Sequence, residues 1–182
     1  MKELFDKTSF RTSKLTTQLY STSFSMGTRF LSPTIQEAIY GIYGFVRFAD
    51  EIVDTFHDFD KARLLNKFKD DTYEAIQDGI SLNPILNSFQ HVVRKYDIDH
   101  SLIDTFLESM EMDLNKSTYS RQGYEKYILG SAEVVGLMCL KVFVYGDQKK
   151  YQELEYSAMR LGAAFQKINF LRDLKADFEE MG

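Results

Sequence analysis

The chain has 182 residues, of which 44% are hydrophobic and 27% charged, and this is ordinary for a single globular domain with a buried core. The net charge of -5 argues against nucleic acid as the main partner. Cys139 is the only cysteine, which excludes an internal disulfide and a cysteine-based metal site and favours a reducing interior.

Apolar residues at helical spacing predict an all-α protein, and no alternating stretch argues for a sheet. Residues 21–30 are interpreted as a helix end and loop. Ser32-Pro33 and Asn83-Pro84 each join a favourable N-cap to a proline at the first helical position, so both pairs predict helix starts. We expect helices over about residues 10–20, 33–56, 61–78, 84–96, 100–114, 122–145 and 149–182, the third and fifth capped by Asp60 and Asp99.

The most apolar run, residues 134–145, is interrupted by Lys141 and is shorter than the about 20 residues that a membrane span needs. Residues 1–20 are polar and mixed in charge, unlike a signal peptide. A cytoplasmic protein is therefore expected, with peripheral membrane contact and the oligomeric state left open. The chain still reads as helix near its end, and Gly182 is consistent with a C-cap or with a chain cut after a functional motif.

Two pairs of aspartates lie inside helices that are otherwise apolar: Asp50 with Asp54, and Asp173 with Asp177. Residues four apart share one helix face, so the paired carboxylates lie about 6 Å apart along the axis. Like charges repel, and burying them without a partner costs much more. The positive charge is therefore expected from outside the protein, and hard divalent cations such as Mg²⁺ prefer oxygen ligands.

Basic and amide side chains flank both pairs. Asn169 extends the second pair along the same helix stripe, while Arg47 and Arg172 flank the first and second pairs. Mg²⁺ usually takes one or two protein carboxylates and completes its shell with water and phosphate oxygens. Arginine grips phosphate with two donors at once. Together these residues predict a ligand rich in phosphate.

A simpler interpretation needs no ligand. Arg47 could pair with Asp50 or Glu51, and Arg172 with Asp173, as a ladder of surface ion pairs. Both interpretations stay open on the residues alone.

Four stretches, in the same order along the chain, resemble motifs of the squalene/phytoene synthase family of head-to-head prenyl transferases. Residues 20–24 resemble its Ser-x-Ser-Phe segment, and residues 127–136 resemble a tyrosine-to-Val-Gly stretch of its central helix. The two aspartate-rich motifs of the family are similar to Tyr43-x-x-x-Arg47-x-x-Asp50-x-x-x-Asp54 and Gly162-x-x-x-Gln166-x-x-Asn169-x-x-Arg172-Asp173-x-x-x-Asp177. The resemblance covers nearly the whole chain but only the N-terminal part of a typical member.

The resemblance implies an all-α bundle of the isoprenoid-synthase type around a central cavity, formed by residues 1–182 as a single domain that lacks its C-terminal helices. It implies a Mg²⁺-dependent enzyme, with Mn²⁺ as a substitute, that joins two prenyl diphosphates through a cyclopropylcarbinyl diphosphate. Phytoene synthesis from geranylgeranyl diphosphate, in carotenoid biosynthesis, is the first expectation. The alternatives are a squalene or dehydrosqualene synthase that uses farnesyl diphosphate, with NADPH only for squalene, and a non-catalytic assembly or binding protein on the same fold.

The resemblance also implies three groups of site residues. The expected metal ligands are Asp50, Asp54, Asn169, Asp173 and Asp177. The residues expected to act on the diphosphates or the reacting carbons are Tyr43, Arg47, Tyr127, Gln166 and Arg172. The residues expected to bind the rest of the substrate are Ser21, Ser23, Phe24, Val135, Gly136, Ala158 and Gly162.

One stretch departs from the family pattern. Ser131-Ala132-Glu133 stands where many members have Val-Ala-Gly, so an additional carboxylate is expected near the site. Glu133 is interpreted as a surface residue, a polar group in the cleft or a mark of altered chemistry. Cys139, on the same apolar helix, is interpreted as a core residue.

Overall fold

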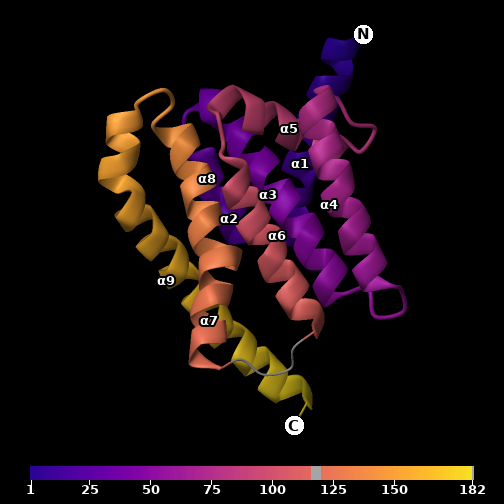
Figure 1. The fold of residues 1–182 in the computed structure, drawn as a ribbon, viewed down its shortest axis with the longest axis vertical. Helices are drawn as coiled ribbons and strands as arrows, with labels where there is room; N and C mark the ends of the chain where they lie inside the picture. Colours follow the sequence, from indigo (N-terminus) through magenta and orange to yellow (C-terminus); the bar gives the residue numbers. More distant parts are fainter. Residues whose placement is uncertain (116–119, 182) are drawn as a thin grey trace.

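The computed structural model describes the backbone of residues 1–115 and 120–181, and the side chains of residues 1–114 and 120–171. The described residues form helices and no strand, which confirms the all-α prediction (Figure 1). The helices are α1 (Lys2–Tyr20), α2 (Thr22–Arg29), α3 (Pro33–Asp54), α4 (Lys61–Asp78), α5 (Pro84–Tyr96), α6 (His100–Asn115), α7 (Arg121–Ile128), the π-helical segment η1 (Leu129–Glu133), α8 (Val134–Phe143) and α9 (Gln148–Met181).

The expected loop over residues 21–30 is wrong, because this segment forms α2. Ser21 has an extended backbone, with φ -149° and ψ 103°, which ends α1. Its side chain then accepts a hydrogen bond from the backbone N–H of Phe24 and so caps the start of α2. A single serine thus ends one helix and starts the next, a role for which its short polar side chain is suited.

The predicted boundaries of α4 and α5 are confirmed by their caps. Asp60 accepts from the backbone N–H of Arg63, and Asn83 accepts from that of Ile85 at 3.0 Å. Gly79 closes α4 with φ +71°, a conformation that favours glycine. Ser32 also stands at a helix start, yet its hydroxyl bonds to the Thr34 hydroxyl and makes no side-chain cap.

This difference gives a matched pair of variants. Asn83→Ala is expected to lower the free energy of unfolding by about 1 kcal/mol, because it removes an N-cap acceptor. Ser32→Ala, which also precedes a proline, is expected to cost less than about 0.5 kcal/mol. Urea unfolding followed by circular dichroism measures both, and equal losses would contradict the assignment of the caps.

The helix expected over residues 122–145 is interrupted by η1. A π-helical turn is rare, and such turns often mark functional sites. Gly130 allows η1 to approach α6 closely, since a methyl group at this position would lie 2.5 Å from the Ser109 Cβ and 2.7 Å from the Thr105 carbonyl oxygen. The sequence does not indicate this interruption, because η1 leads directly into the apolar run of residues 134–145, which predicts one continuous helix.

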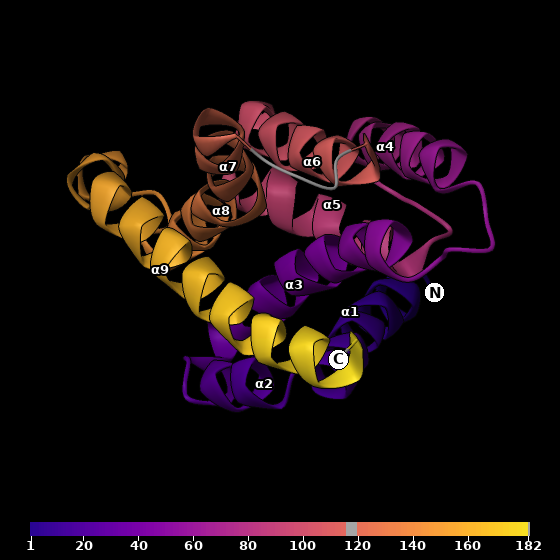
Figure 2. The same ribbon diagram turned by 90° about the horizontal axis from the view of Figure 1, so that it is seen from below.

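Helix α3 lies in the middle of the bundle and α9 lies at its edge, as Figure 2 shows. The core is built on Phe45 of α3, which is fully buried and stacked on Phe89 of α5 with a centroid distance of 3.9 Å. Phe68 and Phe106 extend the cluster to α4 and α6. Because aromatic clusters of this kind fix helix positions, the face of α3 that carries Arg47 and Asp50 is held in a defined orientation.

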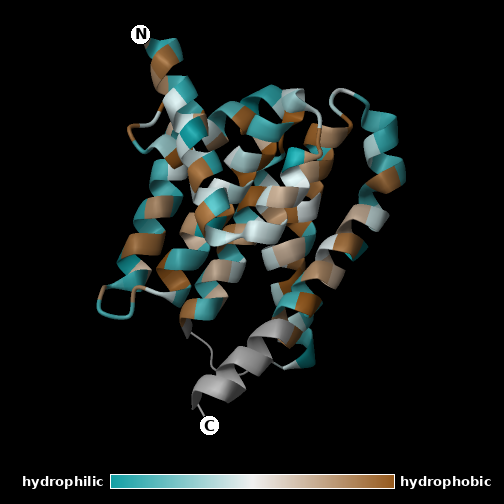
Figure 3. Cartoon of the chain, turned by 180° about the vertical axis from the view of Figure 1, so that it is seen from behind, coloured by the Kyte–Doolittle hydropathy of each residue, from teal (hydrophilic) through white to brown (hydrophobic). Residues whose placement is uncertain are grey.

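Helix α9 packs against α8 and η1, and Figure 3 shows hydrophobic residues interspersed with hydrophilic ones along it. Several of its large apolar side chains are exposed. These residues are Leu154, Leu161, Phe165, Ile168 and Leu171. Within the part of the chain that the structure describes, no helix is both long enough and apolar enough to cross a membrane.

Candidate active site

A cavity of about 750 Å³ lies between α3, the η1–α8 segment and α9, with the α1–α2 junction at its side. Its apolar walls extend along α3 from Ile39, and Asp50 lies eleven residues further, or about 16 Å along the helix axis. On α9 the lining runs from Leu154 to Asn169. The cavity is therefore a long apolar space, and its charged and amide groups lie in the C-terminal halves of α3 and α9: Arg47, Asp50, Gln166 and Asn169.

Most of the predicted site residues line this cavity. They are Ser21, Phe24, Tyr43, Arg47, Asp50, Tyr127, Val135, Gly136, Ala158, Gly162, Gln166 and Asn169. Ser23 is exposed on α2 and does not line it. Asp54 lies one turn beyond Asp50 and is also outside the lining. The side chains of Arg172, Asp173 and Asp177 lie outside the described residues.

The positive charge near Asp50 does not balance the negative charge around its carboxylate. Burial, and then the neighbouring charge of Asp54, raise the pKa of Asp50 to about 7, while Arg47 opposes this shift. The pKa of Asp54 is also raised, by burial and then by Asp113. Three carboxylates thus repel one another at the end of α3, an arrangement that a bound cation would relieve.

Asp113 was not singled out from the sequence. It lies near the end of α6, with no acidic partner at helical spacing that resembles the pairs in α3 and α9. Only the packing of α6 against α3 brings its charge close to Asp50 and Asp54. The oxygen-only character of this group suits Mg²⁺, although no set of three described His, Cys, Asp or Glu side chains is arranged to hold a metal ion.

Arg47 is held by two neighbours. Its Nη2 donates to Glu51 Oε2, and the guanidinium lies over the Tyr20 ring at 4.5 Å from the centroid. The Arg47–Glu51 pair is one of the ion pairs that the ligand-free interpretation expects, and it is present. The Nε of Arg47 is buried and has no hydrogen-bond partner among the described residues.

Aromatic and small residues shape the rest of the cavity. Phe24 of α2 stacks on Tyr43 of α3 at 4.8 Å, and Tyr127 lies 6.0 Å from the Phe170 ring. Gly162 of α9 lies against η1 so closely that a methyl group there would be 2.5 Å from the Ala132 carbonyl oxygen. Gly162 therefore allows close helix packing and adds no side chain to the part of the cavity wall that it forms.

The structure also places residues in or beside the cavity whose position the sequence left open or did not indicate. Cys139 was expected in the core, and it packs against the core while also lining the cavity. Glu133 is half-buried on η1 and does not line the cavity, so the additional carboxylate is not part of its wall. Tyr20, Ser131, Leu161 and Phe165 also line it. None of them was assigned a role from the sequence, although Tyr20, Ser131 and Phe165 lie within the stretches that resemble family motifs.

A sequence model of the squalene/phytoene synthase family matches residues 17–182. Among similar proteins, phytoene synthase 1 of Arabidopsis thaliana is 30% identical over 168 residues, which cover 87% of this chain and 38% of that protein. Phytoene synthase 1 of Solanum lycopersicum is 28% identical over 165 residues, covering 87% of this chain and 39% of that protein. The chain thus spans about two fifths of the length of these chloroplastic relatives.

Solved structures with this fold include those of a dehydrosqualene synthase and a squalene synthase. A dehydrosqualene synthase crystallised with a ligand superposes with a TM-score of 0.82 at 21% identity, covering 97% of this chain and 60% of that one. A squalene synthase from Alicyclobacillus acidocaldarius gives a TM-score of 0.80 at 20% identity, covering 96% of this chain and 64% of that one. The all-helical architecture is therefore that of the squalene synthases, and the chain belongs to the squalene/phytoene synthase family.

Proposed function

We propose that the cavity binds allylic prenyl diphosphates and that the protein joins two of them head to head through a cyclopropylcarbinyl diphosphate. The observation that carries this proposal is a long apolar cavity with Arg47, Asp50 and Asn169 at its polar end. An apolar space suits an isoprenoid chain, and the charged end suits a diphosphate with its metal. Geranylgeranyl diphosphate is the preferred donor, because the relatives at 30% identity are phytoene synthases.

The proposed roles combine the residues that line the cavity with those that match the family pattern. Asp50, Asp54 and Asn169 would hold Mg²⁺ together with Asp173 and Asp177, and Mg²⁺ when bound would stabilise charge on the departing diphosphate. The unpartnered Nε of Arg47 would donate to a diphosphate oxygen. Arg172 is assigned the same task from the family pattern.

The apolar wall would protect the allylic cation that forms when diphosphate departs. Water near this cation would trap it as an alcohol, so the wall must exclude water. The stacked pair of Phe24 and Tyr43 and the ring of Tyr127 lie along the cavity, and aromatic faces stabilise nearby cations. Gln166 lines the cavity one helical turn before Asn169 on α9, and its amide would orient the diphosphate.

The test is to incubate the purified protein with Mg²⁺ and with either geranylgeranyl or farnesyl diphosphate, with and without NADPH, and to identify the hydrocarbon. Phytoene from geranylgeranyl diphosphate is the expected product. Formation of dehydrosqualene, or of squalene when NADPH is present, would mean that farnesyl diphosphate is the donor in place of geranylgeranyl diphosphate. Mg²⁺-dependent binding of inorganic diphosphate, measured by calorimetry, is the second readout. Failure of both turnover and binding would leave a non-catalytic role on the same fold.

A further inference from the structure

Arg47 has two acidic neighbours within reach on its own helix. Asp50 is three residues away and Glu51 four, and both spacings bring side chains together on a helix surface. The structure pairs Arg47 with Glu51, and both side chains are largely buried, with exposed fractions of 26% and 15%. No ion pair joins Arg47 to Asp50 among the described side chains, so the two acids have different environments.

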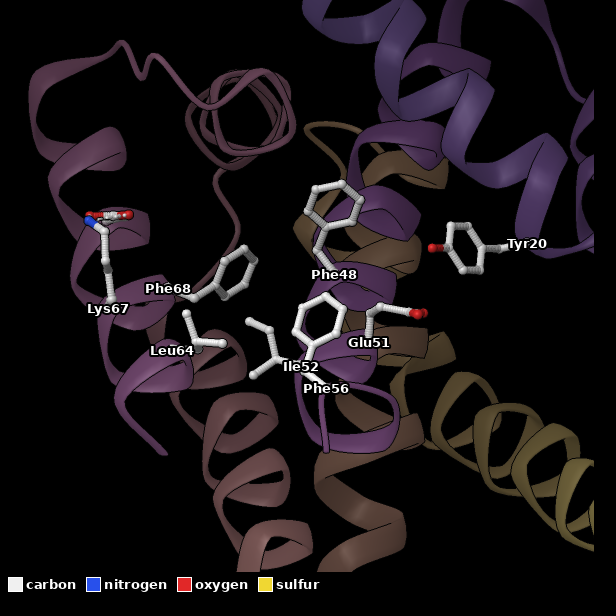
Figure 4. Close-up of a pocket in the computed structure, with 9 residues that line it drawn as sticks. Tyr20, Phe48, Glu51, Ile52, Phe56, Leu64, Lys67 and Phe68 are labelled. Carbon is white, nitrogen blue, oxygen red and sulfur yellow. Dashed lines mark hydrogen bonds and ion pairs between the residues drawn. The ribbon is translucent and has the colours of Figure 1, made fainter. Parts of the chain in front are cut away.

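The two acids also face different spaces. Asp50 lines the large cavity, whereas Glu51 lines a smaller pocket of about 350 Å³ beside α3 and α4. In Figure 4 the Glu51 carboxylate points toward Tyr20, away from Phe68 and Leu64. Tyr20 borders both spaces and supports the guanidinium with its ring. Arg47 is thus held at the boundary between them by Glu51 and Tyr20.

We propose that Glu51 is a positioning residue, which keeps the Arg47 guanidinium off Asp50 and so leaves Asp50 able to bind a divalent cation. Without Glu51, the guanidinium would have Asp50 as its nearest acid on the helix. Asp54 and Asp113 add negative charge around Asp50, so this site would attract the released Arg47 guanidinium strongly. An Arg47–Asp50 pair would occupy the oxygens that the metal needs and would remove Arg47 from the diphosphate. This inference rests on the proposed function, because it assigns the metal to Asp50.

A double-mutant cycle tests the inference through Mn²⁺ binding at pH 8, measured by electron paramagnetic resonance without prenyl diphosphate. Glu51→Gln is expected to weaken Mn²⁺ binding by about tenfold or more, and Arg47→Met alone to change it by less than about threefold. In the double variant, Arg47→Met is expected to restore binding to within about threefold of the parent, because no guanidinium is left to capture Asp50. If Arg47→Met changes the affinity by the same factor in both backgrounds, the effects are only those of charge and the inference is wrong.

A matched control removes one negative charge from the same pocket without touching Arg47. Asp71 lines the smaller pocket and pairs with Lys67, and Asp71→Asn is expected to change Mn²⁺ affinity by less than about twofold. A parent protein that fails to bind Mn²⁺ overturns the inference.

The outcomes separate this inference from the proposed function. Coupling between residues 47 and 51 in a protein that turns over no prenyl diphosphate would defeat the enzymatic proposal and support the positioning role. Turnover of prenyl diphosphate, together with additive effects of the two substitutions on Mn²⁺ affinity, would support the enzymatic proposal and defeat the positioning role.

Discussion

Replacing Asp50 with asparagine is expected to stabilise the fold at pH 8 by about 2 kcal/mol and to abolish Mn²⁺ binding. The pKa of Asp50 is about 7 in the folded protein, against an ordinary value of 3.8. The folded state therefore binds the Asp50 proton more tightly than the unfolded state does. Asp50 does not lower the free energy of unfolding below about pH 4, lowers it increasingly between pH 4 and 7, and has its full effect above pH 7. A shift of this size corresponds to about 4 kcal/mol at most, and we halve it since Asp50 is partly open to water and shares its repulsion with Asp54.

Urea unfolding of the parent and of Asp50→Asn at pH 4 and pH 8 measures this effect. The stability difference should be small at pH 4 and large at pH 8. The control Asp58→Asn, at an exposed position in the turn after α3, should change stability by less than about 0.5 kcal/mol at both pH values. Saturating Mg²⁺ should stabilise the parent at pH 8 and leave Asp50→Asn unaffected. An equal gain at both pH values would show that charge burial is not the cause.

This prediction links stability to function. A carboxylate that destabilises the folded protein when it is ionised is a poor choice for structure alone, but it is useful if a cation is bound there. The sequence conveyed this conflict through Asp50 and Asp54, because two acids on an apolar helix have no local explanation. The residues that share their charge were harder to predict. Asp113 comes from another helix. The spacing allows Arg47 to pair with either Asp50 or Glu51, and only the structure shows that it pairs with Glu51.

The fold shows the same division between local and tertiary causes. The starts of α4 and α5 were predictable, because Asp60 and Asn83 form caps with residues two or three positions away. The α2 helix was missed, since its start depends on the extended backbone of Ser21, and Ser21 also ends α1. The η1 turn was missed because the packing of Gly130 on α6 involves residues twenty or more positions away. Local caps can be read from a sequence, whereas helix-to-helix approaches require the assembled bundle.

Replacing Gly162 with alanine is expected to lower the free energy of unfolding by about 2–3 kcal/mol. A methyl group there would lie 2.5 Å from the Ala132 carbonyl oxygen, 3.1 Å from its carbon and 3.3 Å from the Glu133 Cα. All three atoms belong to the backbone of η1, so no side-chain rotation can relieve the contact, and α9 must move away from η1. This steric cost has to exceed the about 1 kcal/mol by which alanine is normally better than glycine inside a helix.

The same displacement should affect the cavity, because Gly162 and Ala132 both line it. Gly162→Ala is therefore expected to weaken Mg²⁺-dependent diphosphate binding at a temperature where the variant remains folded, as calorimetry can measure. Gly27→Ala is the matched control, since Gly27 lies in α2 with no atom within 4 Å of the added methyl group, and it should stabilise the protein by about 0.5–1 kcal/mol. If both substitutions stabilise the protein, α9 does not depend on close approach at Gly162, and the position of Asn169 at the polar end of the cavity must be fixed by other contacts.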